Sequence, residues 1–118
     1  MKQIDLAALM YASDYDDRFP GRKWMDLELP YTKTIFLDRC PDLIDAKPDD
    51  FGYAMDEKLI GVVSSKLTNP QELPLNFDSV LLGRNEVGGL GLLPSPGRYQ
   101  GQNTIAFADG HAKRISNP

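Results

Sequence analysis

Only a few side chains in this sequence could serve as a nucleophile, a general base or a metal ligand. The chain of 118 residues has one cysteine, Cys40, and one histidine, His111. A catalytic thiol needs a cationic or histidine neighbour that favours the thiolate, and a third group that orients the pair. No such third group is evident, and the Gly-x-Ser-x-Gly and Walker-type motifs are absent. We therefore expect no catalytic residue and no cofactor. The simpler interpretation makes Cys40 a buried thiol and His111 a surface or packing residue, and a small hydrolase is the least favoured alternative.

Carboxylates are the second group of candidates. Asp14, Asp16 and Asp17 follow the first predicted helix, and calcium binds several carboxylate and carbonyl oxygens on a turn. The spacing does not match an EF-hand loop, which needs a glycine at its sixth position and a glutamate at its twelfth. Negative charge near a helix C-terminus is unfavourable, and Arg18 could compensate it. We expect a solvated acidic corner and no metal site, with a bound cation as the alternative.

Composition excludes several classes of protein. The formal net charge is −4, so a nucleic-acid backbone is not an expected partner. A single cysteine allows no intrachain disulfide. No run of about 18 apolar residues is present, and Asp5 lies where a signal peptide would build its apolar region. The sequence therefore predicts one domain, residues 1–118, that is soluble as given.

The strongest helical pattern is at the start of the chain. Every residue from 6 to 12 is apolar, and apolar residues also recur at spacings of three and four from Ile4 to Tyr15. Residues 1–3 offer no N-cap. This pattern is typical either of a helix cut from a longer one or of a buried helix with a frayed end. The helix should end near Asp16–Asp17, before Pro20.

The remaining elements are short. Residues 24–31 could form a brief helix, while residues 51–55 and 73–77 favour strands. Residues 83–101 are rich in glycine and proline, which predicts a long loop. Asp109-Gly110 separates two β-like runs and predicts a hairpin with a type I′ turn. The resulting fold class is α+β, with one N-terminal α-helix packed on a small antiparallel β-sheet with long loops.

Several segments, in this order, resemble one family of bacterial proteins. The matching segments are residues 2–12, residues 14–20, Cys40-Pro41, residues 52–55, Asn69-Pro70, residues 77–79, and the run from Asn103 through Asp109-Gly110-His111. Together they resemble prepilin-type proteins with a C-terminal processing-associated domain, whose pattern is a histidine, nine residues and then Asp-Gly. Two departures stand out. Tyr99 occupies the position of the family's histidine, and the family's basic leader, processing site and apolar anchor are absent.

The resemblance implies a pilin-like fold and a role without catalysis. It divides the chain into the C-terminal half of a pilin helix at 1–17, a connecting segment at 18–50, and the sheet with its hairpin at 51–118. It implies a pseudopilin-like head of a type II secretion or type IV pilus-like filament in the cell envelope, on the periplasmic or extracellular face. Membrane attachment would run only through the missing N-terminal anchor. The partners would be other pilin-like subunits, contacted through the helix residues Ile4, Leu6, Ala8, Leu9, Met10 and Tyr11. The alternative is a soluble binding module on a pilin-like frame, in which residues 83–101 hold a glycan, a peptide or a secreted substrate.

Overall fold

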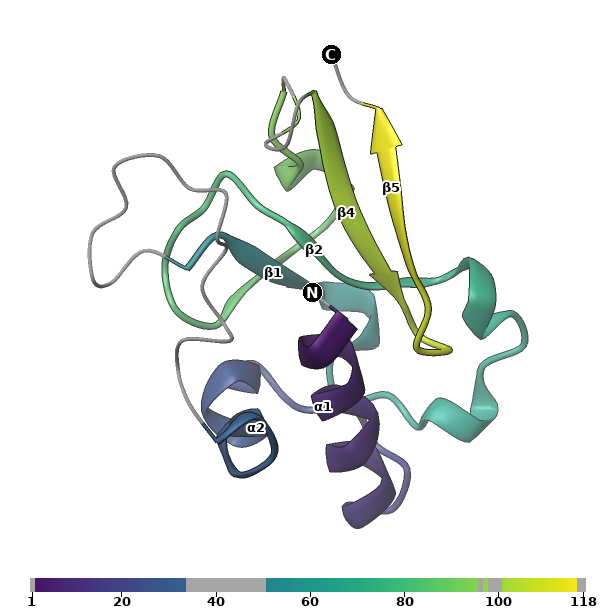
Figure 1. The fold of residues 1–118 in the computed structure, drawn as a ribbon. Helices are drawn as coiled ribbons and strands as arrows, with labels where there is room; N and C mark the ends of the chain where they lie inside the picture. The colour runs from purple at the N-terminus through teal and green to yellow at the C-terminus, as the bar shows by residue number, and fades with distance from the viewer. Residues whose placement is uncertain (1, 34–50, 96, 98–100, 117–118) are drawn as a thin grey trace.

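The computed structural model of the chain describes residues 2–33, 51–95, 97 and 101–116. These residues form two α-helices, followed by one five-stranded sheet (Figure 1). The helices are α1 (Lys2–Asp14) and α2 (Trp24–Thr32). The strands are β1 (Tyr53–Asp56), β2 (Pro74–Asp78), β3 (Glu86–Gly88), β4 (Gln102–Phe107) and β5 (Ala112–Ser116). The predicted α+β class is confirmed, and so is the short helix expected near residues 24–31.

The sheet is mixed, so the prediction of an antiparallel sheet was wrong in one respect. The strand order is β3-β1-β2-β4-β5, in which β1–β2, β2–β4 and β4–β5 are antiparallel. Strand β3 instead lies parallel to β1, with Met55 opposite Val87. Strand β3 has only three residues, which is too short to show alternation in the sequence. It lies inside the segment 83–101 that was predicted to be a loop, together with the 3₁₀ helix η5 (Leu90–Leu92).

The main core lies between the helices and one face of the sheet. Ile4 and Ala8 of α1 and Trp24 of α2 are fully buried there, against Met55 and Leu75 of the sheet. In Figure 1 the two helices lie next to each other on the same side of the sheet. Helix α1 thus covers the sheet with only one of its faces.

A smaller core covers the opposite face of the sheet. It contains Ala54, Phe77 and Ile105, from three neighbouring strands. Leu92 and Leu93, which follow β3, pack against it, and the N–H of Val80 donates to the Leu92 carbonyl at 2.8 Å. The chain that follows β3 therefore folds back over the sheet, and a segment rich in glycine supplies apolar side chains to a core.

Helix α2 is held by a residue that is distant in the sequence. Its N-cap position, Lys23, makes no capping hydrogen bond. Asn85 replaces that cap, because its Oδ1 accepts hydrogen bonds from the N–H groups of Met25 (2.7 Å) and Asp26 (3.3 Å). The indole Nε1–H of Trp24 donates to the Glu86 carbonyl at 2.9 Å. These bonds fasten the first turn of α2 to the edge strand β3.

The predicted hairpin forms between β4 and β5, but its turn is not type I′. The Gly110 N–H donates to the Phe107 carbonyl at 3.0 Å, and the Phe107 N–H donates to the His111 carbonyl at 2.8 Å. Gly110 has a φ of 100°, whereas Asp109 is not among the residues with positive φ. This pattern is a type I turn closed by a glycine bulge, which needs only one left-handed residue.

Candidate functional site

Helix α1 is apolar on two opposite faces, of which only one is covered. Ile4 and Ala8 are fully buried under the sheet, and Ala7 and Ala12 are nearly so. On the other side of the same helix, Leu6 is 44% exposed and Met10 is 52% exposed. The four-residue spacing of these two residues places one above the other along the helix. We call this pair, Leu6 and Met10, the α1 stripe.

The six residues predicted to mediate helix packing divide into three groups. Ile4 and Ala8 lie in the core of the domain, so they have no surface left for a second chain. Leu9 is partly buried and packs against the same core, and its Cδ1 lies 3.0 Å from where a Cβ on Gly110 would be. Leu6 and Met10 are exposed, while Tyr11 is half-buried. The sequence could not separate these groups, because residues 6–12 are all apolar.

Asp5 is a buried carboxylate that the sequence did not single out as a site. It lies in the first turn of α1 and is fully buried, and neither of its oxygens has a hydrogen-bond partner among the described residues. Burial, reinforced by the nearby charge of Asp109, raises the pKa of Asp5 from 3.8 to about 8. Asp5 is therefore protonated in the folded protein at neutral pH. The amide of Asn76 on β2 is also buried, with no partner among the described residues.

The family-motif positions have structural roles where the structure describes them. Asn103 is buried, and its Nδ2 donates to the Pro94 carbonyl at 2.8 Å. Asp109 accepts hydrogen bonds from the His111 backbone N–H at 3.1 Å and contacts His111 Nδ1 at 2.5 Å. These bonds to His111 lower the pKa of Asp109. The Asp109 carboxylate thus caps a backbone amide of the hairpin, and Gly110 supplies the left-handed turn residue.

Cys40, weighed as a possible nucleophile, and Tyr99, a family-motif position, lie outside the described residues. His111 stacks on the Phe107 ring at 4.4 Å between ring centroids, with an interplanar angle of 6°. This packing contact agrees with the structural role expected for the histidine.

Within the part of the chain that the structure describes, the acidic corner contains no compensating ion pair. Asp14, Asp16 and Asp17 are exposed, and none of them pairs with a cation among the described residues. Arg18, proposed above as their partner, instead donates through Nη1 to the Gly61 carbonyl at 3.2 Å. Within the described part of the chain, no three His, Cys, Asp or Glu side chains lie close enough to hold a metal ion.

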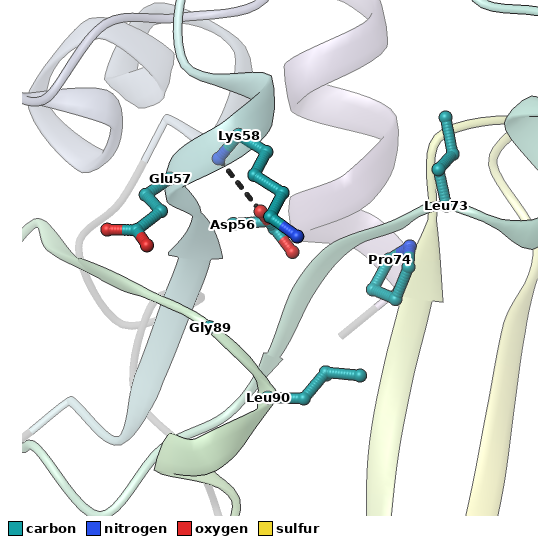
Figure 2. A pocket seen from close by; sticks show the side chains of 7 residues that line it. All are labelled: Asp56, Glu57, Lys58, Leu73, Pro74, Gly89 and Leu90. Carbon is teal, nitrogen blue, oxygen red and sulfur yellow. Dashed lines mark hydrogen bonds between the residues drawn. The ribbon is translucent and has the colours of Figure 1, made fainter.

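A pocket of about 280 Å³ opens where β1 ends and β2 begins (Figure 2). Leu73, Pro74 and Leu90 form its apolar side. Asp56 and Lys58 face them, while Glu57 points away from the other two charged side chains (Figure 2). The carboxylate of Asp56 accepts a hydrogen bond from the Lys58 backbone N–H at 2.8 Å. None of the described residues that line this pocket is a histidine or a cysteine. The lining suits the binding of a short apolar group better than acid–base chemistry.

Neither helix in the described ranges combines the length and the apolar character needed to cross a bilayer. No protein-family model, curated protein or solved structure matches this chain.

Proposed function

We propose that this chain is a non-enzymatic assembly subunit, a pilin-like head of a type II secretion or type IV pilus-like filament in the cell envelope. Its α1 stripe contacts a neighbouring pilin-like subunit. The observation that supports this proposal is the exposure of Leu6 and Met10 on a helix whose opposite face is already buried. An apolar stripe of this kind is characteristic of a helix with partners on two sides.

The arrangement of elements also favours a pilin-like head. One N-terminal helix lies across a sheet in which four neighbouring strands, in the order β1-β2-β4-β5, pair antiparallel. The β4–β5 hairpin supports the proposal, because the family resemblance leads us to expect a closing hairpin there. The parallel edge strand β3 is an addition to that scheme.

The expected energy of the contact follows from the exposed area. Complete burial of one Leu or Met side chain is worth about 1.5–3 kcal/mol. Roughly half of each side chain in the α1 stripe is exposed, so covering both would contribute about 2 kcal/mol. Removing that contribution would weaken association about thirtyfold.

Sedimentation velocity over a concentration series tests the proposal. The double variant Leu6→Ser, Met10→Ser should lose most of the self-association of the parent chain, with an unchanged circular dichroism spectrum. The matched control is Val80→Ser, Leu81→Ser, which removes two apolar side chains of similar exposure, 52% and 41%, from another surface. A parent chain that stays monomeric at every concentration, or equal losses in the two double variants, would contradict the proposal.

A second candidate function is a binding module, which the pocket in Figure 2 favours. Gly89 and Leu90 belong to the segment 83–101 expected to hold a ligand, and they line the pocket. Its apolar side would take an aliphatic side chain of a peptide, with the charged groups at the rim. Titration with a mixture of short leucine-containing peptides, followed by NMR, would shift the signals of Leu73 and Leu90 if this function holds. Signals that stay unchanged at saturating peptide would exclude it.

A further inference from the structure

Three tyrosine side chains form a surface at the end of α1 that neither the assembly contact nor the pocket uses. The rings of Tyr11 and Tyr15 stack, with centroids 4.2 Å apart and an interplanar angle of 15°. Tyr31 of α2 meets Tyr11 edge-on, with centroids 6.4 Å apart and an interplanar angle of 81°. We call Tyr11, Tyr15 and Tyr31 the tyrosine surface. Tyr11 and Tyr31 are half-buried, whereas Tyr15 is 54% exposed, so one ring of the stack turns much of its area to solvent.

The arrangement of the three rings is fixed by contacts within the domain. The Tyr31 hydroxyl donates to Asp14 Oδ2 at 2.5 Å, which links α2 to the last turn of α1. That hydrogen bond raises the pKa of Tyr31 to about 12, so the phenol stays neutral at physiological pH. Tyr11 and Tyr15 are four residues apart, a spacing at which side chains meet on a helix. A ligand would therefore meet rings that are already ordered, at little cost in conformational entropy.

Carboxylates outnumber cationic side chains in the chain segment next to the tyrosine surface, where Arg18 is the neighbouring cation. Asp14 contacts Tyr31 directly, and Asp16 and Asp17 follow Tyr15 in the sequence. All three carboxylates are exposed, and none has a cationic partner among the described residues. The last turn of α1 contains no basic residue, so the negative end of the helix dipole adds to their charge. The faces of the aromatic rings carry negative charge density as well. All three contributions have the same sign and outnumber the single charge of Arg18, whose Nη1 donates to the Gly61 carbonyl, so together they favour a cation.

We infer that the tyrosine surface docks an arginine-bearing segment of a protein partner, with a guanidinium stacked on the open face of Tyr15 and paired with the neighbouring carboxylates. The carboxylates favour a positively charged ligand, and the flat Tyr15 ring favours a ligand group that is planar. Arginine satisfies both requirements, because its guanidinium stacks on aromatic faces and binds carboxylates through two N–H groups. An ammonium group meets only the first requirement. A neutral sugar could stack on the ring but would not need the three negative charges.

The inference does not depend on the proposed filament role, because the tyrosine surface includes neither Leu6 nor Met10. A double variant of the α1 stripe, Leu6→Ser, Met10→Ser, should therefore bind an arginine-bearing peptide as the parent chain does. Failure of the filament proposal and failure of this one are thus measured in different experiments.

The test is a titration of the full chain with a (Gly-Arg)₄ peptide, followed by NMR or calorimetry. The control ligands are (Gly-citrulline)₄, which keeps the planar shape but lacks the charge, and (Gly-Lys)₄, which keeps the charge but lacks the plane. The arginine peptide should bind most tightly and should shift the Tyr15 ring signals. A soluble oligosaccharide serves as the probe for the sugar alternative.

Two variants separate stacking from general charge attraction. Tyr15→Leu should weaken the binding of the arginine peptide about two- to fivefold, the range of an exposed cation–π contact, while Tyr15→Phe should bind normally. Asp16→Asn, Asp17→Asn removes two charges without straining the backbone, because both residues have positive φ, near 60°, a conformation that asparagine tolerates. This variant should weaken binding and reduce its dependence on salt.

Several results would overturn the inference. One is equal binding of the citrulline and arginine peptides. Another is that Tyr15→Leu binds the arginine peptide as the parent chain does, while Asp16→Asn, Asp17→Asn no longer binds it. That outcome would mean that the peptide is attracted by charge alone, without stacking on the ring. Binding of the oligosaccharide with no preference for arginine would assign the tyrosine surface to a sugar instead.

Discussion

Replacing the buried Asp5 by asparagine should stabilise the protein, and the gain should depend on pH. Asp5→Asn keeps the size and shape of the side chain but removes the ionisable proton. In the folded state the Asp5 carboxyl has a pKa of about 8, whereas an exposed aspartate titrates near 3.8. The unfolded chain therefore loses its proton over a pH range in which the folded chain keeps it.

The sign of the pH dependence follows from proton binding. Between about pH 4 and pH 8 the folded state binds more protons at Asp5 than the unfolded state, so stability falls as pH rises. Below this window Asp5 is protonated in both states, so its ionisation does not change the free energy of unfolding. Each pKa unit is worth about 1.4 kcal/mol, which sets an upper bound of about 5–6 kcal/mol at the alkaline end. Water penetration and relaxation around a buried carboxyl reduce this figure, and we expect a gain of about 2–3 kcal/mol for Asp5→Asn near neutral pH.

The effect is measured by urea denaturation of the parent chain and of Asp5→Asn. Each protein is unfolded near both ends of the pH window and at its centre. The difference in unfolding free energy should be small at the acidic end and largest at the alkaline end, with similar denaturant slopes. Asp16→Asn is the matched control, because it removes one negative charge from an exposed position and should change stability by less than about 0.5 kcal/mol. A gain for Asp5→Asn that does not vary with pH, or an equal gain for Asp16→Asn, would refute the reasoning.

Three further predictions concern the attachment of α2 to β3. Trp24→Phe should lower stability by about 2 kcal/mol, because it leaves the Glu86 carbonyl without its 2.9 Å hydrogen bond and opens a gap in the core. Unfolding should be followed by circular dichroism, because Trp24 is the only tryptophan and its replacement removes the fluorescence signal. Asn85→Ala should cost about 1–2 kcal/mol by removing the cap on the Met25 N–H. Asn85→Gly should cost less than Asn85→Ala, because Asn85 has a φ of 62° and glycine adopts that conformation without strain. Equal losses in the two variants would mean that backbone strain does not contribute to the cost of Asn85→Ala.

Local patterns in the sequence were enough to predict most of the elements. The three- and four-residue spacing of apolar residues predicted α1, and Asp109-Gly110 predicted the β4–β5 hairpin. The turn type was misjudged because Asp-Gly suits two kinds of hairpin turn, and only the hydrogen bonds of Phe107 distinguish them. Strand β3 was missed because three residues bordered by glycine give no periodic signal.

The candidate surfaces could not be predicted from local patterns, because they depend on contacts between residues far apart in the sequence. Nothing in an all-apolar run shows which side of the helix will meet the sheet, so Leu6 and Ala8 could not be told apart before folding. The raised pKa of Asp5 likewise arises because folding buries this residue and brings Asp109 near it. The sequence alone shows only an acidic residue in the first turn of a helix.

By itself, then, the sequence determined the α+β class, the helix at the start, the hairpin at the end and the lack of a recognised catalytic motif. These features depend on neighbouring residues and on the fixed periods of helices and strands. The tertiary structure alone decided that β3 pairs parallel to β1, that Asn85 caps a helix about sixty residues earlier, and that Tyr31 joins Tyr11 and Tyr15 in one surface. Those contacts join residues far apart along the chain, and their partners are set by how the layers pack rather than by any local pattern.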